Sequence, residues 1–91
     1  MDNFEDVRSK VQATIQQVLE NTDRRRQSFE DDDLLFAELG LDSLDLAQVV
    51  VALEQTLGVD PFRSGTLSIR NFGDLVRAYD AEMRKLSKNT M

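Results

Sequence analysis

The stretch LGLDSLDLAQVVVALEQTL, residues 39–57, predicts a central helix and with it the class of fold. The helix is expected over residues 43–57. Asp42 precedes it as a good N-cap, because its side chain can accept a hydrogen bond from a backbone N–H of the first turn. Asp45 completes a capping-box pattern and places negative charge at the positive end of the helix dipole. Gly58 is a good C-terminal stop.

This central helix has more apolar surface than one side of a bundle core requires. One stripe suits the core and comprises Leu46, Val49, Val50, Leu53 and Leu57. A second, narrower stripe at helical spacing comprises Leu44, Ala47 and Val51. Its polar rim comprises Asp45, Gln48 and Glu54. Periodicity leaves two interpretations open for the second stripe, which are burial under the preceding loop and docking of partner proteins.

Two further helices flank the central one, each with apolar residues every three or four positions. The first is expected over about Phe4–Leu19, with an apolar face of Phe4, Val7, Val11, Ile15, Val18 and Leu19. The last is expected over about Phe72–Leu86, with an apolar face of Phe72, Leu75, Val76, Tyr79, Met83 and Leu86. Asn3 and Asn71 stand at their N-cap positions, each three residues before an aspartate. A frayed tail is expected over Ser87–Met91.

The two connections between these helices differ in length and character. The first spans about 20 residues, which is long for a loop without secondary structure in a compact domain. Apolar anchors are expected to hold it over the bundle, namely Phe29, Leu34, Leu35, Phe36 and Leu39. The second connection contains Pro61 and Gly65, so that only a short helical turn fits, near Arg63–Leu67.

The composition bounds the chemistry available to this chain. Its 91 residues predict one domain over residues 1–91, with a core of about residues 4–86. The chain has no cysteine and no histidine, so it lacks thiolate chemistry, the commonest general base and the commonest metal ligand. We therefore expect that it is not an enzyme. A net charge of −6 disfavours nucleic acid and anionic membranes. It indicates either partners with basic patches or a charge that only keeps the protein soluble.

Ser43 is the residue at which chemistry is expected. It falls at the first position of the central helix, where a phosphate ester would meet free backbone N–H groups and the positive end of the dipole. A flexible group attached there would be held at its root and free at its tip. Considered alone, the tripeptide at residues 42–44 is common, and an ordinary polar residue in a first helical turn is the favoured explanation of it.

The wider context resembles the acyl carrier protein family. The resemblance rests on LFAELGLDSLD at residues 35–45, VVVALE at residues 49–54, LGV at residues 57–59 and NFGDLV at residues 71–76, and it extends from about Val7 to Tyr79. It implies an all-α, acyl-carrier-protein-like four-helix bundle with a long first loop and a short third helix. Ser43 matches the serine to which a phosphopantetheinyl transferase attaches 4′-phosphopantetheine from coenzyme A, with magnesium. The thiol of that arm then carries the acyl group as a thioester, which would make the chain a phosphoprotein of fatty-acid, lipid or polyketide-type synthesis.

The same resemblance assigns expected roles around Ser43. Asp42 and Leu44 flank the attachment point. The family positions that contact partner enzymes, which include acyl-loading and acyl-transferring enzymes, are matched by Asp42, Leu44, Asp45, Val51 and Glu54. Gln48, on the polar rim, is expected to join them. The expected protein is a cytoplasmic monomer without nucleic-acid partners or membrane insertion.

The chain departs from the carriers of primary fatty-acid synthesis. Gln48, Gln55 and Thr56 stand where those carriers usually have acids, and residues 60–65 lack their acidic short-helix pattern. A specialised carrier with dedicated partners is therefore expected. A carrier of amino acids or aryl acids and an adaptor that only binds proteins remain alternatives. A calcium loop at residues 31–38 is disfavoured, because these acids break the order of ligands that an EF-hand requires.

Overall fold

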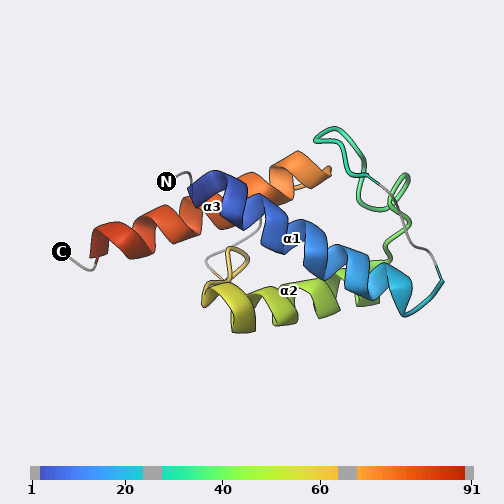
Figure 1. Ribbon diagram of the computed structural model, residues 1–91, viewed down its shortest axis with the longest axis horizontal. Helices are drawn as coiled ribbons and strands as arrows, with labels where there is room; N and C mark the ends of the chain where they lie inside the picture. The colour runs from blue at the N-terminus through green and yellow to red at the C-terminus, as the bar shows by residue number, and fades with distance from the viewer. Residues whose placement is uncertain (1–2, 24–27, 64–67, 90–91) are drawn as a thin grey trace.

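The computed structural model describes residues 3–23, 28–63 and 68–89. Within these ranges the chain forms three helices, α1 (Asn3–Glu20), α2 (Ser43–Leu57) and α3 (Phe72–Asn89), and no strand beyond an isolated bridge between Leu34 and Asn71. Both α2 and α3 run back against the direction of α1, which packs against each of them (Figure 1). The predicted all-α class is confirmed.

The fourth helix of the expected bundle stays a prediction. Residues 64–67, which make up most of the short helix expected near Arg63–Leu67, lie outside the described residues. Immediately before them the chain makes a turn, in which the N–H of Arg63 donates to the carbonyl of Asp60 at 3.2 Å.

The core lies between α1 and the other two helices, largely where the apolar patterns placed it. Every residue of the predicted α1 face except Phe4 is buried, and Phe4 packs half-buried against the cluster. From α2, Val49 and Leu53 are fully buried, while Leu46 and Leu57 pack against them half-buried. Val50 is also half-buried.

The end of α3 differs from prediction. Its first part contributes four fully buried side chains, those of Phe72, Leu75, Val76 and Tyr79. Leu86, predicted on the same face, is 45% exposed, because the last turns of α3 extend past the start of α1 (Figure 1). The helix also continues to Asn89 rather than ending at Leu86, and the frayed tail stays a prediction.

Two of the three predicted N-caps form as expected. Asp42, in extended conformation, accepts from the N–H of Asp45 at 2.7 Å, and the carboxylate of Asp45 accepts from the N–H of Asp42 at 3.2 Å. At α3, Asn71 accepts from the N–H of Asp74 at 2.8 Å, and the Asp74 carboxylate accepts from the N–H groups of Arg70 and Asn71. The third prediction is wrong, since Asn3 is the first residue of α1 rather than its cap.

The segment of residues 28–41, called the strap below, crosses from α1 to the start of α3. Three backbone hydrogen bonds fasten it there, from Leu35 N–H to the Arg70 carbonyl at 3.0 Å, from Phe72 N–H to the Asp33 carbonyl at 2.9 Å and from Gly73 N–H to the Asp31 carbonyl at 2.8 Å. A Cβ at Gly73 would lie 3.0 Å from the Asp31 Cβ and 3.1 Å from the Asp31 carbonyl oxygen, so a larger residue there would have to push the strap away by a few tenths of an ångström.

The predicted anchors of the strap divide into two groups. Phe29, Leu35 and Leu39 are buried, and the ring of Phe29 lies 5.2 Å from that of Phe72, centroid to centroid. Leu34 and Phe36 are exposed instead, because the chain turns over residues 35–38 and the side chains on either side of Leu35 face outward.

Arg8 joins α1 to the strap and to α3. Its guanidinium pairs with Asp31, donates to the Phe29 carbonyl at 3.3 Å and lies 4.8 Å from the centre of the Phe72 ring. A cation over an aromatic face is attracted by the ring quadrupole, so this one side chain ties three segments together. None of the described helices is both long enough and apolar enough to cross a membrane.

Candidate functional site

Ser43 is the first residue of α2, and its side chain is exposed. The chain approaches it through Leu39 and Leu41, which are both buried, with Gly40 between them in the left-handed region at φ 78°. The N–H of Leu41 donates to the Leu35 carbonyl at 3.0 Å. Buried leucines on one side and the helix on the other therefore fix the backbone of Ser43 while its hydroxyl faces solvent.

The start of α2 offers donors beside this hydroxyl. The first amides of a helix have no partner inside the helix, and here the N–H of Asp45 is already bonded to Asp42. Among the described residues, no group accepts from the N–H of Ser43 or of Leu44. Two amides and the positive end of the helix dipole thus remain available to a phosphate attached at Ser43.

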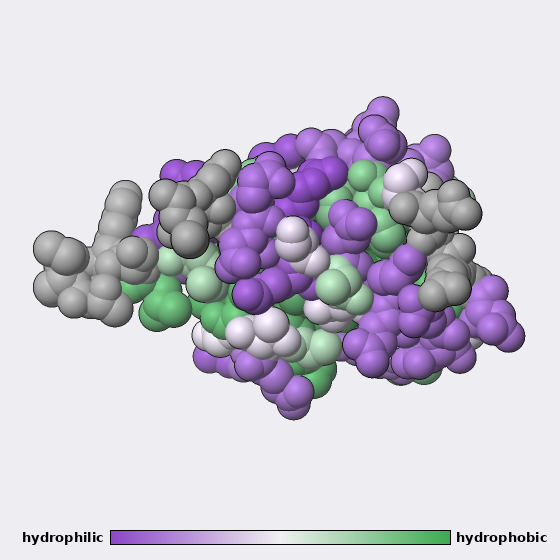
Figure 2. All heavy atoms as spheres, in the orientation of Figure 1, coloured by the Kyte–Doolittle hydropathy of each residue, from purple (hydrophilic) through white to green (hydrophobic). Residues whose placement is uncertain are grey.

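The second apolar stripe of α2 faces outward. Leu44 is 67% exposed and Val51 is 56% exposed, and Ala47 lies exposed between them. A shallow hollow on this face is lined by Ala47, Gln48, Val51, Ala52 and Gln55. Figure 2 shows hydrophobic side chains reaching the surface along α2, next to a largely hydrophilic surface over α1. The strap does not cover this stripe, which rules out the first of the two interpretations.

Two of the expected docking residues, Asp45 and Glu54, are less exposed than the others. Asp45 is only 7% exposed, and its carboxylate serves the cap of α2, so it presents little surface to a partner. The reason is its position at the third residue of the helix, where the side chain folds back toward Asp42. Glu54 is half-buried and accepts from Arg63 at 2.9 Å. Gln48 is exposed, as expected.

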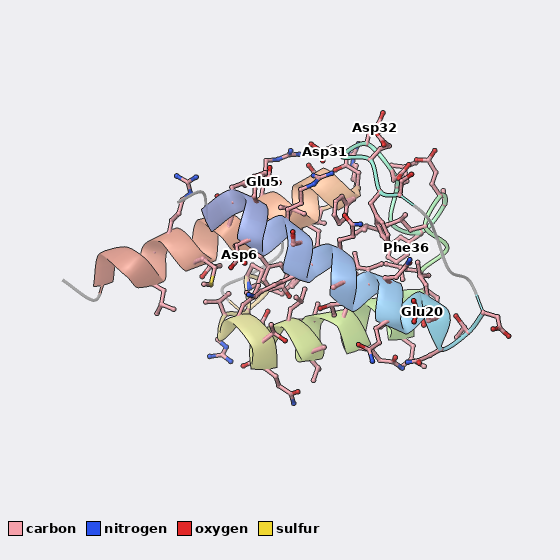
Figure 3. All side chains as sticks on the ribbon, in the orientation of Figure 1. Glu5, Asp6, Glu20, Asp31, Asp32 and Phe36 are labelled. Carbon is pink, nitrogen blue, oxygen red and sulfur yellow. The ribbon has the colours of Figure 1, made fainter. Side chains whose placement is uncertain are left out.

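The acidic side chains of the first loop form hydrogen bonds and an ion pair that hold the strap in its conformation. The Asp33 carboxylate accepts from the N–H of Glu30 at 2.9 Å, the Glu38 carboxylate accepts from the N–H of Leu34 at 2.7 Å, and Asp31 pairs with Arg8. Figure 3 shows Asp31 and Asp32 where the strap passes the start of α3. In the part of the chain that the structure describes, no three acidic side chains gather in a way that would hold a metal ion.

Two features of the structure were missed by the sequence interpretation. Phe36 is 55% exposed and lies on the strap at the end of the molecule where α2 begins (Figure 3). The side chain of Tyr79 is fully buried, and its hydroxyl has no hydrogen-bond partner among the described residues. Burial, and then the negative charges of Asp60 and Glu54, raise the pKa of Tyr79. Apolar periodicity identified Tyr79 only as a core residue and carried no signal for its hydroxyl.

Comparison with known proteins identifies the class to which this site belongs. Residues 9–78 match the family model of the phosphopantetheine attachment site, and the chain therefore belongs to this family. Its members attach 4′-phosphopantetheine covalently and act as carriers rather than as catalysts. No curated protein and no solved structure matched the chain.

Proposed function

We propose that this protein is an acyl carrier protein whose Ser43 bears the 4′-phosphopantetheine arm. The observation that supports this most directly is the exposure of Ser43 at the start of α2, beside two amides to which no described group is bonded. The position lies inside the range that matches the attachment-site family. The surrounding residues fit a phosphate ester, since the Ser43 and Leu44 amides would donate to its oxygens and the helix dipole would stabilise its charge.

Attachment requires a transferase and coenzyme A. The Ser43 oxygen attacks the phosphorus that bears the pantetheine, and a new O–P bond forms. The bond from that phosphorus to the bridging oxygen of the diphosphate breaks, adenosine 3′,5′-bisphosphate leaves, and the hydroxyl proton passes to the transferase. The chain itself supplies no histidine to activate this serine, so its part is to hold the hydroxyl in reach.

The arm gives the chain a thiol that its own side chains lack. An acyl group is held there as a thioester, and partner enzymes load, modify or remove it. The chain presents this cargo without catalysing a step itself. Its proposed location is the cytoplasm and its proposed state is a monomer. An amino-acid or aryl-acid carrier remains the alternative cargo class, and the enzyme that loads the arm distinguishes between them.

The proposed docking surface is the outward stripe of α2. It comprises Leu44, Ala47, Gln48 and Val51, with Glu54 at its edge. Asp42 and Leu44 flank the arm and contact the transferase. Asp45 is left out of this surface, because its carboxylate is used within the cap. Gln48 and Gln55, which line the hollow, are uncharged. The surface therefore offers little to the basic docking sites of enzymes that bind acidic carriers. It suits dedicated partner enzymes of a lipid, polyketide or related pathway better.

Intact-mass measurement tests the assignment. The wild type incubated with coenzyme A, magnesium and a phosphopantetheinyl transferase of broad specificity should gain about 340 Da, the mass of one arm. Ser43→Ala should gain nothing. Ser9→Ala is the matched control, since Ser9 is an exposed serine on α1, and it should be modified like the wild type. A wild type that stays unmodified, or a modified Ser43→Ala protein, contradicts the proposal.

A further inference from the structure

The hydroxyl of Tyr79 stands apart from the other polar groups of the interior. Two other polar side chains are buried in the described ranges, and both are engaged, Asp45 with Asp42 and Asp80 with the guanidinium of Arg84 at 2.8 Å. The Tyr79 hydroxyl has no partner there. Buried polar groups are nearly always paired, and an unpaired one weakens the folded state. A phenylalanine would fill the same space without that cost, so the hydroxyl calls for a function.

Tyr79 lies toward the C-terminal end of α2, which is the end opposite Ser43. The charged groups that act on its hydroxyl are the carboxylates of Asp60 and Glu54. Both carboxylates already have donors, Asp60 from the N–H of Phe62 at 2.9 Å and Glu54 from Arg63 at 2.9 Å. Because burial and these charges raise its pKa, the hydroxyl keeps its proton and acts as a hydrogen-bond donor.

The length of α2 is compatible with contact between the cargo and this hydroxyl. From Ser43 to Glu54 the helix rises by about 16 Å, at 1.5 Å per residue, a distance that the arm and its cargo together span. The molecule is hollowed at this end by a pocket with Glu54, Gly58, Val59, Asp60, Arg63 and Glu82 in its lining. Beside the core, Val59, Phe62 and Met83 are only partly buried. Side chains of this kind can make way for an apolar chain more readily than the fully buried ones.

We propose that the Tyr79 hydroxyl is a recognition group for the acyl cargo, donating a hydrogen bond to a keto or hydroxyl oxygen on a chain that enters between the helices. The inference rests on the proposed function and narrows it to oxygen-bearing acyl groups. A plain alkyl chain offers no acceptor and leaves the hydroxyl unpaired. A trapped water is the competing occupant, but a buried water needs two to four polar partners. The buried side chains other than Tyr79, Asp45 and Asp80 are apolar in the described part of the chain.

The test compares matched cargoes on wild type and Tyr79→Phe. A phosphopantetheinyl transferase loads both proteins from hexanoyl-, 3-oxohexanoyl- or 5-oxohexanoyl-coenzyme A, and intact mass confirms each loading. The rate of thioester cleavage by dithiothreitol, a thiol that leaves the keto group intact, is then measured. For at least one oxo cargo, thioester cleavage should be at least about threefold slower in the wild type than in Tyr79→Phe. One ordinary hydrogen bond between the hydroxyl and the cargo gives a factor of this size. For hexanoyl the two proteins should react equally.

A direct optical readout accompanies the kinetics. Tyr79 is the one tyrosine of the sequence, which has no tryptophan, so tyrosine absorbance and emission report on this site alone. The protected oxo cargo should shift both spectra relative to the hexanoyl protein. Equal protection for all cargoes, or the same spectra with the arm alone as with every cargo, overturns the inference. Failure of the wild type to accept any arm contradicts the proposed function instead, and mass separates the two failures.

Discussion

Asp42 and Ser43 are neighbours with separate tasks at the start of α2. The Asp42 side chain bonds the N–H of Asp45 at 2.7 Å and thereby fixes where the helix begins. Ser43 then points its hydroxyl into solvent from a fixed backbone. Since the cap depends on an oxygen acceptor and not on charge, substitutions of Asp42 can separate its structural part from any part in recognition.

Asp42→Ala should lower the free energy of unfolding by about 1 kcal/mol, the usual cost of losing an N-cap. Asp42→Asn should cost much less, because asparagine offers the same acceptor to the N–H of Asp45. Urea denaturation followed by circular dichroism measures both. Equal destabilisation by the two substitutions would contradict the cap as the source of the effect. Because the proposed contact with the transferase uses the charge of the carboxylate, Asp42→Asn should be loaded more slowly than the wild type while remaining nearly as stable.

At the scale of the element, α2 presents one face to the core and another to solvent. Leu53 is fully buried, and Leu44, nine residues earlier, is mostly exposed. Leu53→Ala should therefore cost about 2–5 kcal/mol of unfolding free energy, and Leu44→Ala less than about 0.5 kcal/mol. Chemical denaturation of the two variants checks the difference. A large loss for Leu44→Ala would mean that its side chain is covered in solution and is not part of a docking surface.

At the start of α3, a pH dependence follows from Asp74. Backbone hydrogen bonding, chiefly from the N–H of Arg70, and the Arg77 guanidinium lower the pKa of Asp74 below its ordinary value of 3.8. A carboxyl whose pKa is lower in the folded state stabilises the fold above its unfolded pKa. That contribution is lost as the pH falls through the folded-state value.

Asp74→Asn should therefore be less stable than the wild type at about pH 6, and the difference should shrink as the pH falls below about 4. Once the wild-type carboxyl is protonated, it no longer accepts hydrogen bonds as an anion and resembles the neutral amide. Urea midpoints for both proteins between about pH 6 and 2.5 measure this. A difference that stays constant over the whole range would show that Asp74 contributes through its shape alone.

The helices were predictable because apolar spacing and cap residues act locally. The bounds of α2 follow from Asp42 and Gly58, and both are visible in the sequence. The exposure of Leu34 and Phe36 was not predictable, because it depends on how the strap turns against α3, a contact between distant segments. The part that Asp45 plays in the cap was predicted, because a capping box is local, but the resulting burial of its side chain was not.

At the scale of the whole molecule, the net charge of −6 opposes folding through self-repulsion. Raising NaCl from about 0.01 to 0.15 M shortens the Debye length from about 30 to 8 Å. The thermal midpoint should rise over this range, since each exposed ion pair contributes little that screening can remove. Scanning calorimetry measures the shift. A midpoint that falls with added salt would mean that pairs such as Arg8–Asp31 outweigh the general repulsion.

The fastening of the strap has a consequence for how the protein matures. The carbonyl of Arg70 and the amides of Phe72 and Gly73 come almost thirty residues after Ser43, yet they hold the segment that leads to it. A nascent chain emerging from the ribosome exposes the serine before it has made these three partners. We therefore expect the transferase to modify Ser43 efficiently only after α3 has been synthesised and holds the strap in place. Attachment of the arm then follows translation.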